Sequence, residues 1–270
     1  MTYTNRTTRI GFRAWTVIVL IFLWLPLAII AILSFNDSKS LAWPPKGFTV
    51  SWWTKAFHNE GARDALEMSI RTALIATAIA LILGTAASFA VQRFRFFGRE
   101  TLSLMIVLPI ALPGIVTGIA LNSAFRKAGI ELGLRTLVIA HATFCVVVVY
   151  NNVLARLRRL SPNLEEASSD LGADTFQTFA YVTFPLLRSA LLAGGLLAFG
   201  LSFDEIVVTT FTNGAGSDLQ TLPQWILDNL SRGAQQPIVN VMATAVMVFS
   251  LVPVWAAQRL TGDQGGLAGR

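Results

Sequence analysis

The sequence contains little charge, almost no cysteine and only two histidines. Asp, Glu, Lys and Arg make up 13% of the 270 residues, about half of the roughly 25% found in soluble globular proteins. The one cysteine, Cys145, has no partner in the chain for a disulfide, and His58 and His141 are too isolated to suggest a zinc site. These shortages exclude a soluble domain and a disulfide framework, and we expect no metal site.

The sequence also lacks the residues of an ATP-hydrolysing site. None of its four lysines follows a glycine, so the phosphate-binding motif G-x-x-x-x-G-K-[ST] does not occur. It shows no Ser/His/Asp or Cys/His arrangement and no acid pair placed for hydrolysis. We therefore expect no catalytic residue and no cofactor held by this chain.

What the chain does contain is hydrophobic residues, 54% of the total, gathered in long runs. Six runs are long enough for the about 20 residues that a membrane-crossing helix needs. They cover roughly residues 14–35, 72–92, 101–125, 136–155, 189–212 and 237–258. The prediction is an all-α integral membrane protein with an N-terminal segment 1–13, a membrane domain 14–260 and a flexible Gly-rich tail 261–270.

The basic residues orient this domain. If both chain ends are cytoplasmic, 12 of the 21 Lys and Arg residues lie inside, and the cluster Arg156-Leu157-Arg158-Arg159 directly follows the fourth span. The positive-inside bias acts most strongly next to span ends. The same bias accounts for the net charge of +6, so the bilayer, and no nucleic acid, is the expected partner.

One inside segment, residues 156–188, is unusually long for a connector. Ser161 is a favourable helix cap, and Pro162 suits the first helical position, where its missing N–H costs nothing. Gly172 suits the left-handed residue that ends a helix. On this first helix, the small residues Ala167 and Ser168 share a face and allow close approach of another backbone.

A second short helix follows in the same loop. Asp174 and Gln177 form a capping box that opens it. Pro185 is expected to mark its end, just before the fifth span.

The loop resembles the cytoplasmic "EAA" loop of ABC importer permeases, whose pattern is E-A-A, three residues, G, nine residues, I-x-L-P. Here Glu166-Ala167-Ser168-Ser169-Asp170-Leu171-Gly172 is followed nine residues later by Val182-Thr183-Phe184-Pro185. The spacing matches throughout. Ser168 replaces the second Ala, and Val182 and Phe184 replace the Ile and Leu.

The resemblance implies a six-span permease of a bacterial inner-membrane importer, with both termini cytoplasmic. It implies that the loop docks on a separate ATPase dimer, which binds ATP and Mg. The implied coupling residues are Glu166, Ala167, Ser168, Gly172 and Pro185. A second permease of different sequence and a periplasmic substrate-binding protein are the other implied partners. An alternative, a helix lying on lipid, is disfavoured by three acids beside an anionic leaflet.

More narrowly, the chain resembles the second permease of spermidine/putrescine-type importers over about residues 15–260. The likeness lies in Thr77 to Gly84, the Pro109/Pro113 span and Ser202-Phe203-Asp204-Glu205. Two alternatives stay open. Either the same machine serves another substrate, such as ferric iron, thiamine or an opine, or the chain is a self-contained secondary carrier.

Polar residues inside the spans suggest a substrate path. Asp204 and Glu205 are the one acidic pair inside an apolar run, and such residues usually face a bundle interior or a water-filled path. An ion pair between spans is the alternative. Pro109 and Pro113 predict either a broken helix beside the path or a simple kink.

The remaining polar features have structural explanations. His141, Thr143, Asn151 and Asn152 are expected to form hydrogen bonds between helices. The outside loop 36–67, with its tryptophans between Trp43 and Trp53, is either a membrane-surface anchor or a docking surface for an external protein. In the outside segment 213–237, residues 222–227 are expected to form a short interfacial helix.

Overall fold

The computed structural model describes residues 6–39, 43–161, 163–214, 219–233 and 235–262. Apart from one isolated bridge between Asn36 and Phe48, the regular structure of these residues is entirely helical. Five of the helices in this part of the chain are long and apolar enough to cross a membrane, and a bent pair makes a sixth if it counts as one span. The predicted all-α membrane fold is therefore confirmed.

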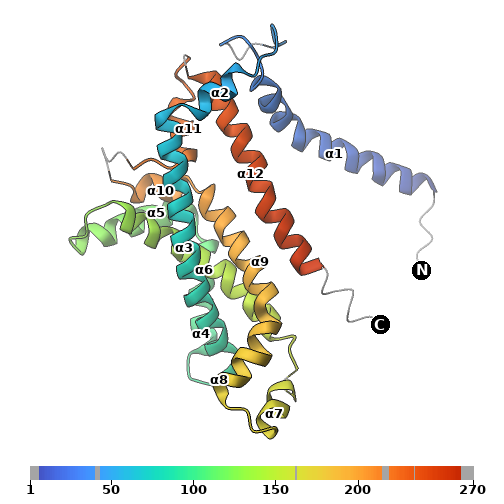
Figure 1. Ribbon diagram of the computed structural model, residues 1–270, viewed down its shortest axis with the longest axis vertical. Coiled ribbons are helices and arrows are strands. Elements are labelled where there is room, and N and C mark those ends of the chain that lie inside the picture. Colours follow the sequence, from blue (N-terminus) through green and yellow to red (C-terminus); the bar gives the residue numbers. More distant parts are fainter. Residues whose placement is uncertain (1–5, 40–42, 162, 215–218, 234, 263–270) are drawn as a thin grey trace. The chain divides into compact units, whose positions relative to one another are not determined.

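Every predicted span has a helical counterpart (Figure 1). The long helices are α1 (Arg6–Leu33), α3 (Glu60–Arg93), α6 (Leu134–Leu157), α9 (Phe184–Phe203) and α12 (Gln236–Gly262). The third predicted span is divided into α4 (Arg99–Ala111) and α5 (Gly114–Lys127), which meet at 108°. The shorter helices are α2 (Ser51–Phe57), α7 (Asn163–Asp170), α8 (Thr175–Thr178), α10 (Val207–Thr212) and α11 (Leu222–Asn229).

The chain divides into two compact units. Unit 1 comprises Met1–Arg63 and Ile226–Met247, and unit 2 comprises Asp64–Trp225 and Val248–Arg270. In unit 1, helix α1 exposes all its described side chains from Thr8 to Ala28. A helix that is apolar on every side is typical of a membrane span surrounded by lipid or by other helices.

Helix α3 begins earlier than the predicted span, which starts at residue 72. Its first turns, from Glu60, carry Arg63, Asp64 and the pair Glu67–Arg71, whose charged groups lie 3.7 Å apart. These charges favour water, so the first three turns extend beyond an apolar span. The predicted outside loop 36–67 is thus shorter than expected, and it contains α2 as well.

Unit 2 is organised around α6, whose residues supply much of the buried core, including Phe144, Val149 and Val153. Helix α9 packs closely on it at Gly194, where an added Cβ would lie only 3.4 Å from the Val149 Cα. Gly194 therefore permits this close packing, since any larger residue would need the space that α6 occupies.

Candidate functional site

The loop between α6 and α9 folds as two helices joined at a glycine, as predicted. Helix α7 ends at Asp170, and Gly172 has a φ of +84°, the left-handed conformation that favours glycine. The Asp174 carboxylate accepts a hydrogen bond from the Gln177 amide nitrogen at 2.8 Å, and the Gln177 side chain accepts one from Asp174 N–H at 3.0 Å. This capping box opens α8. Helix α7 begins at Asn163, and Pro162, which was predicted at the first helical position after Ser161, lies outside the described residues.

Glu165 fixes the position of this loop against the rest of unit 2. Its carboxylate accepts hydrogen bonds from Arg93 at the end of α3 and, at 2.6 Å, from the Thr183 hydroxyl. Partial burial raises the pKa of Glu165, but the hydrogen bonds from Arg93 and Thr183 and the charge of Arg93 outweigh it, so the net pKa is lowered. The carboxylate is therefore ionised and bridges α3, α7 and the segment after α8.

Other side chains reinforce this arrangement. The Arg93 guanidinium lies 5.3 Å from the ring centre of Phe89, which in turn packs edge-on against Phe179 at 5.9 Å. The Ser168 hydroxyl lies 3.0 Å from the Thr178 hydroxyl. Ser168, which was predicted to present a small surface to a partner, thus also joins α7 to α8. Neither Arg93 nor Glu165 belongs to the EAA spacing pattern, so that pattern did not reveal their pairing.

The rest of the loop presents side chains to the outside. Glu166 and Ala167 are exposed. Three large apolar residues are also exposed, with 88% of Leu171, 77% of Phe176 and 80% of Tyr181 accessible. Such apolar exposure on a charged loop marks an interaction surface.

Pro185 does not end the second helix, contrary to the prediction. Helix α8 continues through a single π-helical turn, η1 (Phe179–Thr183), into α9, so that residues 175–203 form one helical run. In the π turn, the N–H of Phe184 bonds to the carbonyl of Phe179, five residues back. Pro185 then occupies the first turn of α9, where a proline is tolerated.

The acidic pair Asp204–Glu205 occupies a break between two helices instead of a continuous fifth span. Helix α9 ends at Phe203 and α10 begins at Val207. A Glu205 carboxylate oxygen accepts the N–H of Val208 at 2.8 Å and so caps α10. Asp204 is exposed, and no hydrogen bond to its carboxylate is found among the described residues. The two acids therefore differ. The Glu205 carboxylate is engaged by the backbone of α10, whereas the exposed Asp204 carboxylate is available to a charged ligand.

His141 joins the two helices on either side of this break. It is fully buried on α6, and its ring nitrogens lie 2.8 Å from the Ser202 hydroxyl and 2.9 Å from the Thr209 hydroxyl. The predicted interhelical role of His141 is thus confirmed. The same prediction was wrong for Thr143 and Asn152, whose side chains bond to carbonyls of their own helix, Ala140 and Val148.

The bend between α4 and α5 lies at Pro113, while Pro109 is accommodated inside α4. Helix α5 then packs tightly on α10. A Cβ at Gly118 would lie 2.7 Å from the Phe211 ring, and the Asn122 side chain donates a hydrogen bond to the Phe211 carbonyl. The bent helix pair and the Asp204 break therefore belong to one packed arrangement around α10.

The comparisons with known proteins agree with this architecture. A family model described as the inner membrane component of binding-protein-dependent transport systems matches residues 76–262. The chain belongs to this permease family. This membership decides against a self-contained secondary carrier.

Two relatives cover nearly the whole permease. The spermidine/putrescine transport system permease protein PotC of Haemophilus influenzae is 33% identical over 250 residues, which are 92% of this chain and 95% of that protein. The putrescine transport system permease protein PotI of Escherichia coli is 33% identical over 245 residues, 86% of this chain and 85% of that protein. Both are transport subunits, and this chain is likewise a transport subunit and not an enzyme.

The fold is that of solved importers. The structure of a bacterial ABC transporter that imports the acidic polysaccharide alginate matches with a TM-score of 0.67 at 17% identity, covering 97% of this chain and 99% of that chain. The permease is accordingly a multi-pass inner membrane component of a binding-protein-dependent transport system, with the fold of ABC importer permeases.

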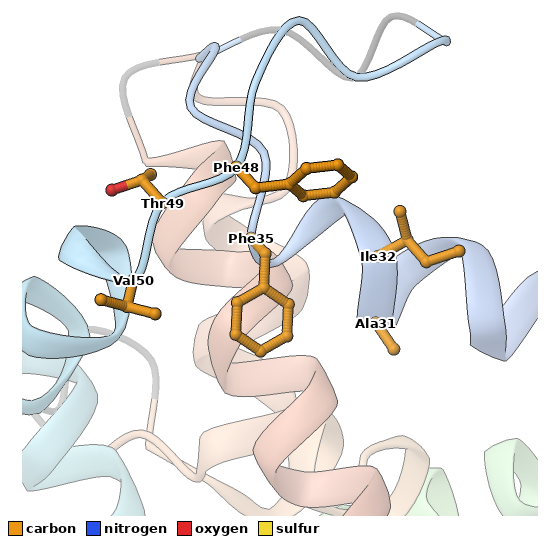
Figure 2. A pocket seen from close by; sticks show the side chains of 6 residues that line it. All are labelled: Ala31, Ile32, Phe35, Phe48, Thr49 and Val50. Atoms are coloured by element: carbon orange, nitrogen blue, oxygen red, sulfur yellow. The ribbon is translucent and has the colours of Figure 1, made fainter.

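The predicted outside loop of the permease contains a hollow within unit 1. Backbone hydrogen bonds from Asp37 to Gly47 and from Thr49 to Phe35 close residues 37–47 into a loop at the end of α1. Figure 2 shows Ile32, Phe35 and Phe48 lining the hollow of about 680 Å³ beside it. The Phe35 and Trp53 rings stack with centres 5.3 Å apart. This ordered, apolar surface fits either predicted role of the loop, membrane anchoring or protein docking.

The predicted interfacial helix also forms, as α11. Its first residue, Leu222, is 1% exposed, and its backbone N–H bonds to the Ser69 hydroxyl of α3 at 2.8 Å. Leu222 therefore packs inside unit 2 instead of lying on the membrane surface. No group of three metal-ligating side chains occurs among the described residues.

Proposed function

We propose that this permease forms half of the translocation path of a polyamine importer. The observation that carries the proposal is the match to permeases named for spermidine and putrescine over 86–92% of the chain. The second half of the path would be a permease of different sequence. ATP and Mg would be bound by the ATPase dimer, because this chain has no phosphate-binding motif.

In this proposal the loop of α7 and α8 docks in a groove of the ATPase. Glu166, Ala167, Leu171 and Phe176 would make the contact, since all four are exposed. Gly172 sets the angle between the two helices, and Glu165 ties the loop to α3. ATP-driven movement of the ATPase would then pass through η1 into α9, because residues 175–203 form one uninterrupted helical run.

Asp204 would attract the ammonium groups of the substrate along the path. Counted from Arg188, it lies about 24 Å along α9 at 1.5 Å per residue, within the outer half of a hydrocarbon core about 30 Å thick. An exposed carboxylate at that depth suits a cation, since a charge in lipid costs about 2.5–3.5 kcal/mol on insertion scales. The break at Pro113 would line the same path. Loaded binding protein would meet the outside loops 43–53 and 213–237.

The test is ATP hydrolysis and uptake by the reconstituted complex, supplied with its binding protein and one candidate substrate at a time. Spermidine or putrescine should stimulate hydrolysis and enter the vesicles. Stimulation by ferric iron, thiamine or an opine instead would assign the same machine to that substrate. If no permease variant changed the rate of ATP hydrolysis by the complex, the coupling role of the α7–α8 loop would be contradicted.

Asp204→Asn provides the matched test of the cation path. We expect about a tenfold loss in uptake efficiency at low polyamine concentration, because one attraction on the order of 1.4 kcal/mol is removed. Co-purification with the ATPase should be unchanged. The control is Asp64→Asn, an equal charge change at an exposed position in the first turns of α3. Equal uptake by both variants would remove Asp204 from the path.

A further inference from the structure

The loop between α3 and α4 combines exposed aromatic rings with arginines. Residues 93–99 read Arg-Phe-Arg-Phe-Phe-Gly-Arg. Phe94 is 64% exposed, Phe96 41% and Phe97 106%. Three exposed phenylalanines in five residues would be unfavourable in water, so this loop contacts something apolar. The proposed function does not account for these side chains.

The same loop surrounds a cavity of about 800 Å³. Arg95 and Arg99 line it together with Phe96, Phe97 and Met105. Glu100 also lines it, so the cavity carries two positive charges and one negative charge. Among the described residues, no ion pair involves Arg95 or Arg99, whereas Arg93 is bonded to Glu165. A positive, partly apolar cavity therefore lies open on the loop.

The position of the loop identifies the surroundings of this cavity. Only residues 94–98 separate α3 from α4, and five residues reach at most about 18 Å when fully extended. Helix α3 is a candidate membrane span, and α4 is the first half of the bent pair that passes the same test together with α5. The loop must therefore lie at the membrane surface, whichever leaflet that surface belongs to.

We propose that this cavity binds the headgroup of an anionic phospholipid. The guanidinium groups of Arg95 and Arg99 take the phosphate, since the planar arginine fork matches phosphate oxygens. The rings of Phe96 and Phe97 extend toward the acyl chains, as aromatic side chains do at a membrane boundary. Glu100 repels the phosphate and confines it to the arginine side. A soluble phosphate would bring no apolar partner for the exposed rings. This inference does not depend on which substrate the permease carries.

Native mass spectrometry of the intact transporter complex tests the site. The complex is titrated with phosphatidylglycerol or with phosphatidylcholine of the same acyl chains, so that only the headgroup differs. We expect retained phosphatidylglycerol in the wild type. The double variant Arg95→Gln/Arg99→Gln should bind it about thirtyfold more weakly, from about one basic-residue contribution per arginine. This variant should also no longer bind phosphatidylglycerol in preference to phosphatidylcholine.

The matched control is Arg158→Gln/Arg159→Gln, which removes the same charge from two exposed residues after α6 that do not line the cavity. This variant should retain the lipid. Equal loss in both double variants would overturn the site in favour of diffuse attraction. Displacement of the lipid by soluble glycerol phosphate would overturn it in favour of a soluble phosphate ligand. If the glutamine variant fails to assemble, Arg95→Lys/Arg99→Lys keeps the charge but removes the fork. Its affinity should then be intermediate, and wild-type affinity would contradict the proposal.

Discussion

Two adjacent glutamates in α7 face different surroundings, and this difference separates loop stability from docking. Glu165 bridges Arg93 and Thr183, whereas Glu166 is exposed. A partly exposed ion pair contributes on the order of 1 kcal/mol. Glu165→Gln should therefore lower the thermal stability of the detergent-solubilised permease by about that amount, and Glu166→Gln should leave it unchanged. Co-purification with the ATPase should decrease for Glu166→Lys. Equal stability of the two glutamine variants would contradict the bridging role.

The pH dependence of this contribution follows from the lowered pKa of Glu165. Because the folded-state pKa lies below that of the unfolded chain, ordinarily about 4.3, the stabilisation is complete above that value. It is lost only as the pH falls through the lowered folded-state pKa. The stability difference between wild type and Glu165→Gln should hence be constant from pH 8 to pH 6.

His141 is the second residue whose contribution can be isolated. Replacing it with Ala removes two interhelical hydrogen bonds, each worth about 0.6 kcal/mol on average in membrane proteins, and leaves a cavity. We expect a loss of about 2 kcal/mol or more in unfolding measurements. Thr143→Val on the same helix removes only a bond to the neighbouring Ala140 carbonyl and should cost less than about 0.5 kcal/mol. Similar losses in both variants would show that the bridge contributes nothing.

At the scale of elements, α5 and α10 pack closely at Gly118. A methyl group at Gly118 would lie 2.7 Å from the Phe211 ring and 3.0 Å from its Cβ, so Gly118→Ala must displace Phe211. Overpacking of this kind costs about 1–3 kcal/mol. In Gly11→Ala, by contrast, the new methyl meets nothing within 4 Å, and this change in α1 should be neutral or slightly stabilising. Thermal unfolding of the two variants in one detergent makes the comparison, and an unaffected Gly118→Ala would contradict the packing.

Local signals in the sequence predicted the elements well and their breaks less well. The capping box at Asp174 and the left-handed Gly172 depend on neighbouring residues alone, so the sequence revealed both. The end of α9 at Phe203 was missed because apolar residues continue past it to Thr212. Pro185 was misread, since a proline in the first turn of a helix looks the same in sequence as one after its end.

The candidate site shows the same difference between local features, which the sequence reveals, and features that depend on distant residues. The spacing from Glu166 to Pro185 was visible in sequence because it is a local pattern. The partner of Glu165 was not, because Arg93 lies 72 residues earlier in the chain and only the packing of α3 beside the loop brings them together. The distinction between Asp204 and Glu205 likewise depends on α10, whose first turn uses the Glu205 carboxylate.

The whole permease has an orientation that its own cysteine content makes easy to test. Cys145, the sole cysteine, is fully buried, so it should stay silent toward membrane-impermeant thiol reagents. Three exposed serines then serve as near-isosteric sites, Ser161 before α7, Ser51 in α2 and Ser231 after α11. If both termini are cytoplasmic, Ser161→Cys should react only in inverted vesicles, and Ser51→Cys and Ser231→Cys only in right-side-out vesicles. The wild type measures the background from Cys145.

The reverse pattern would place the arginine-flanked loop and its ATPase contact on the wrong side of the membrane. Reaction of all three from one side would contradict six crossings, because an odd number of spans must separate Ser161 from each of the other two.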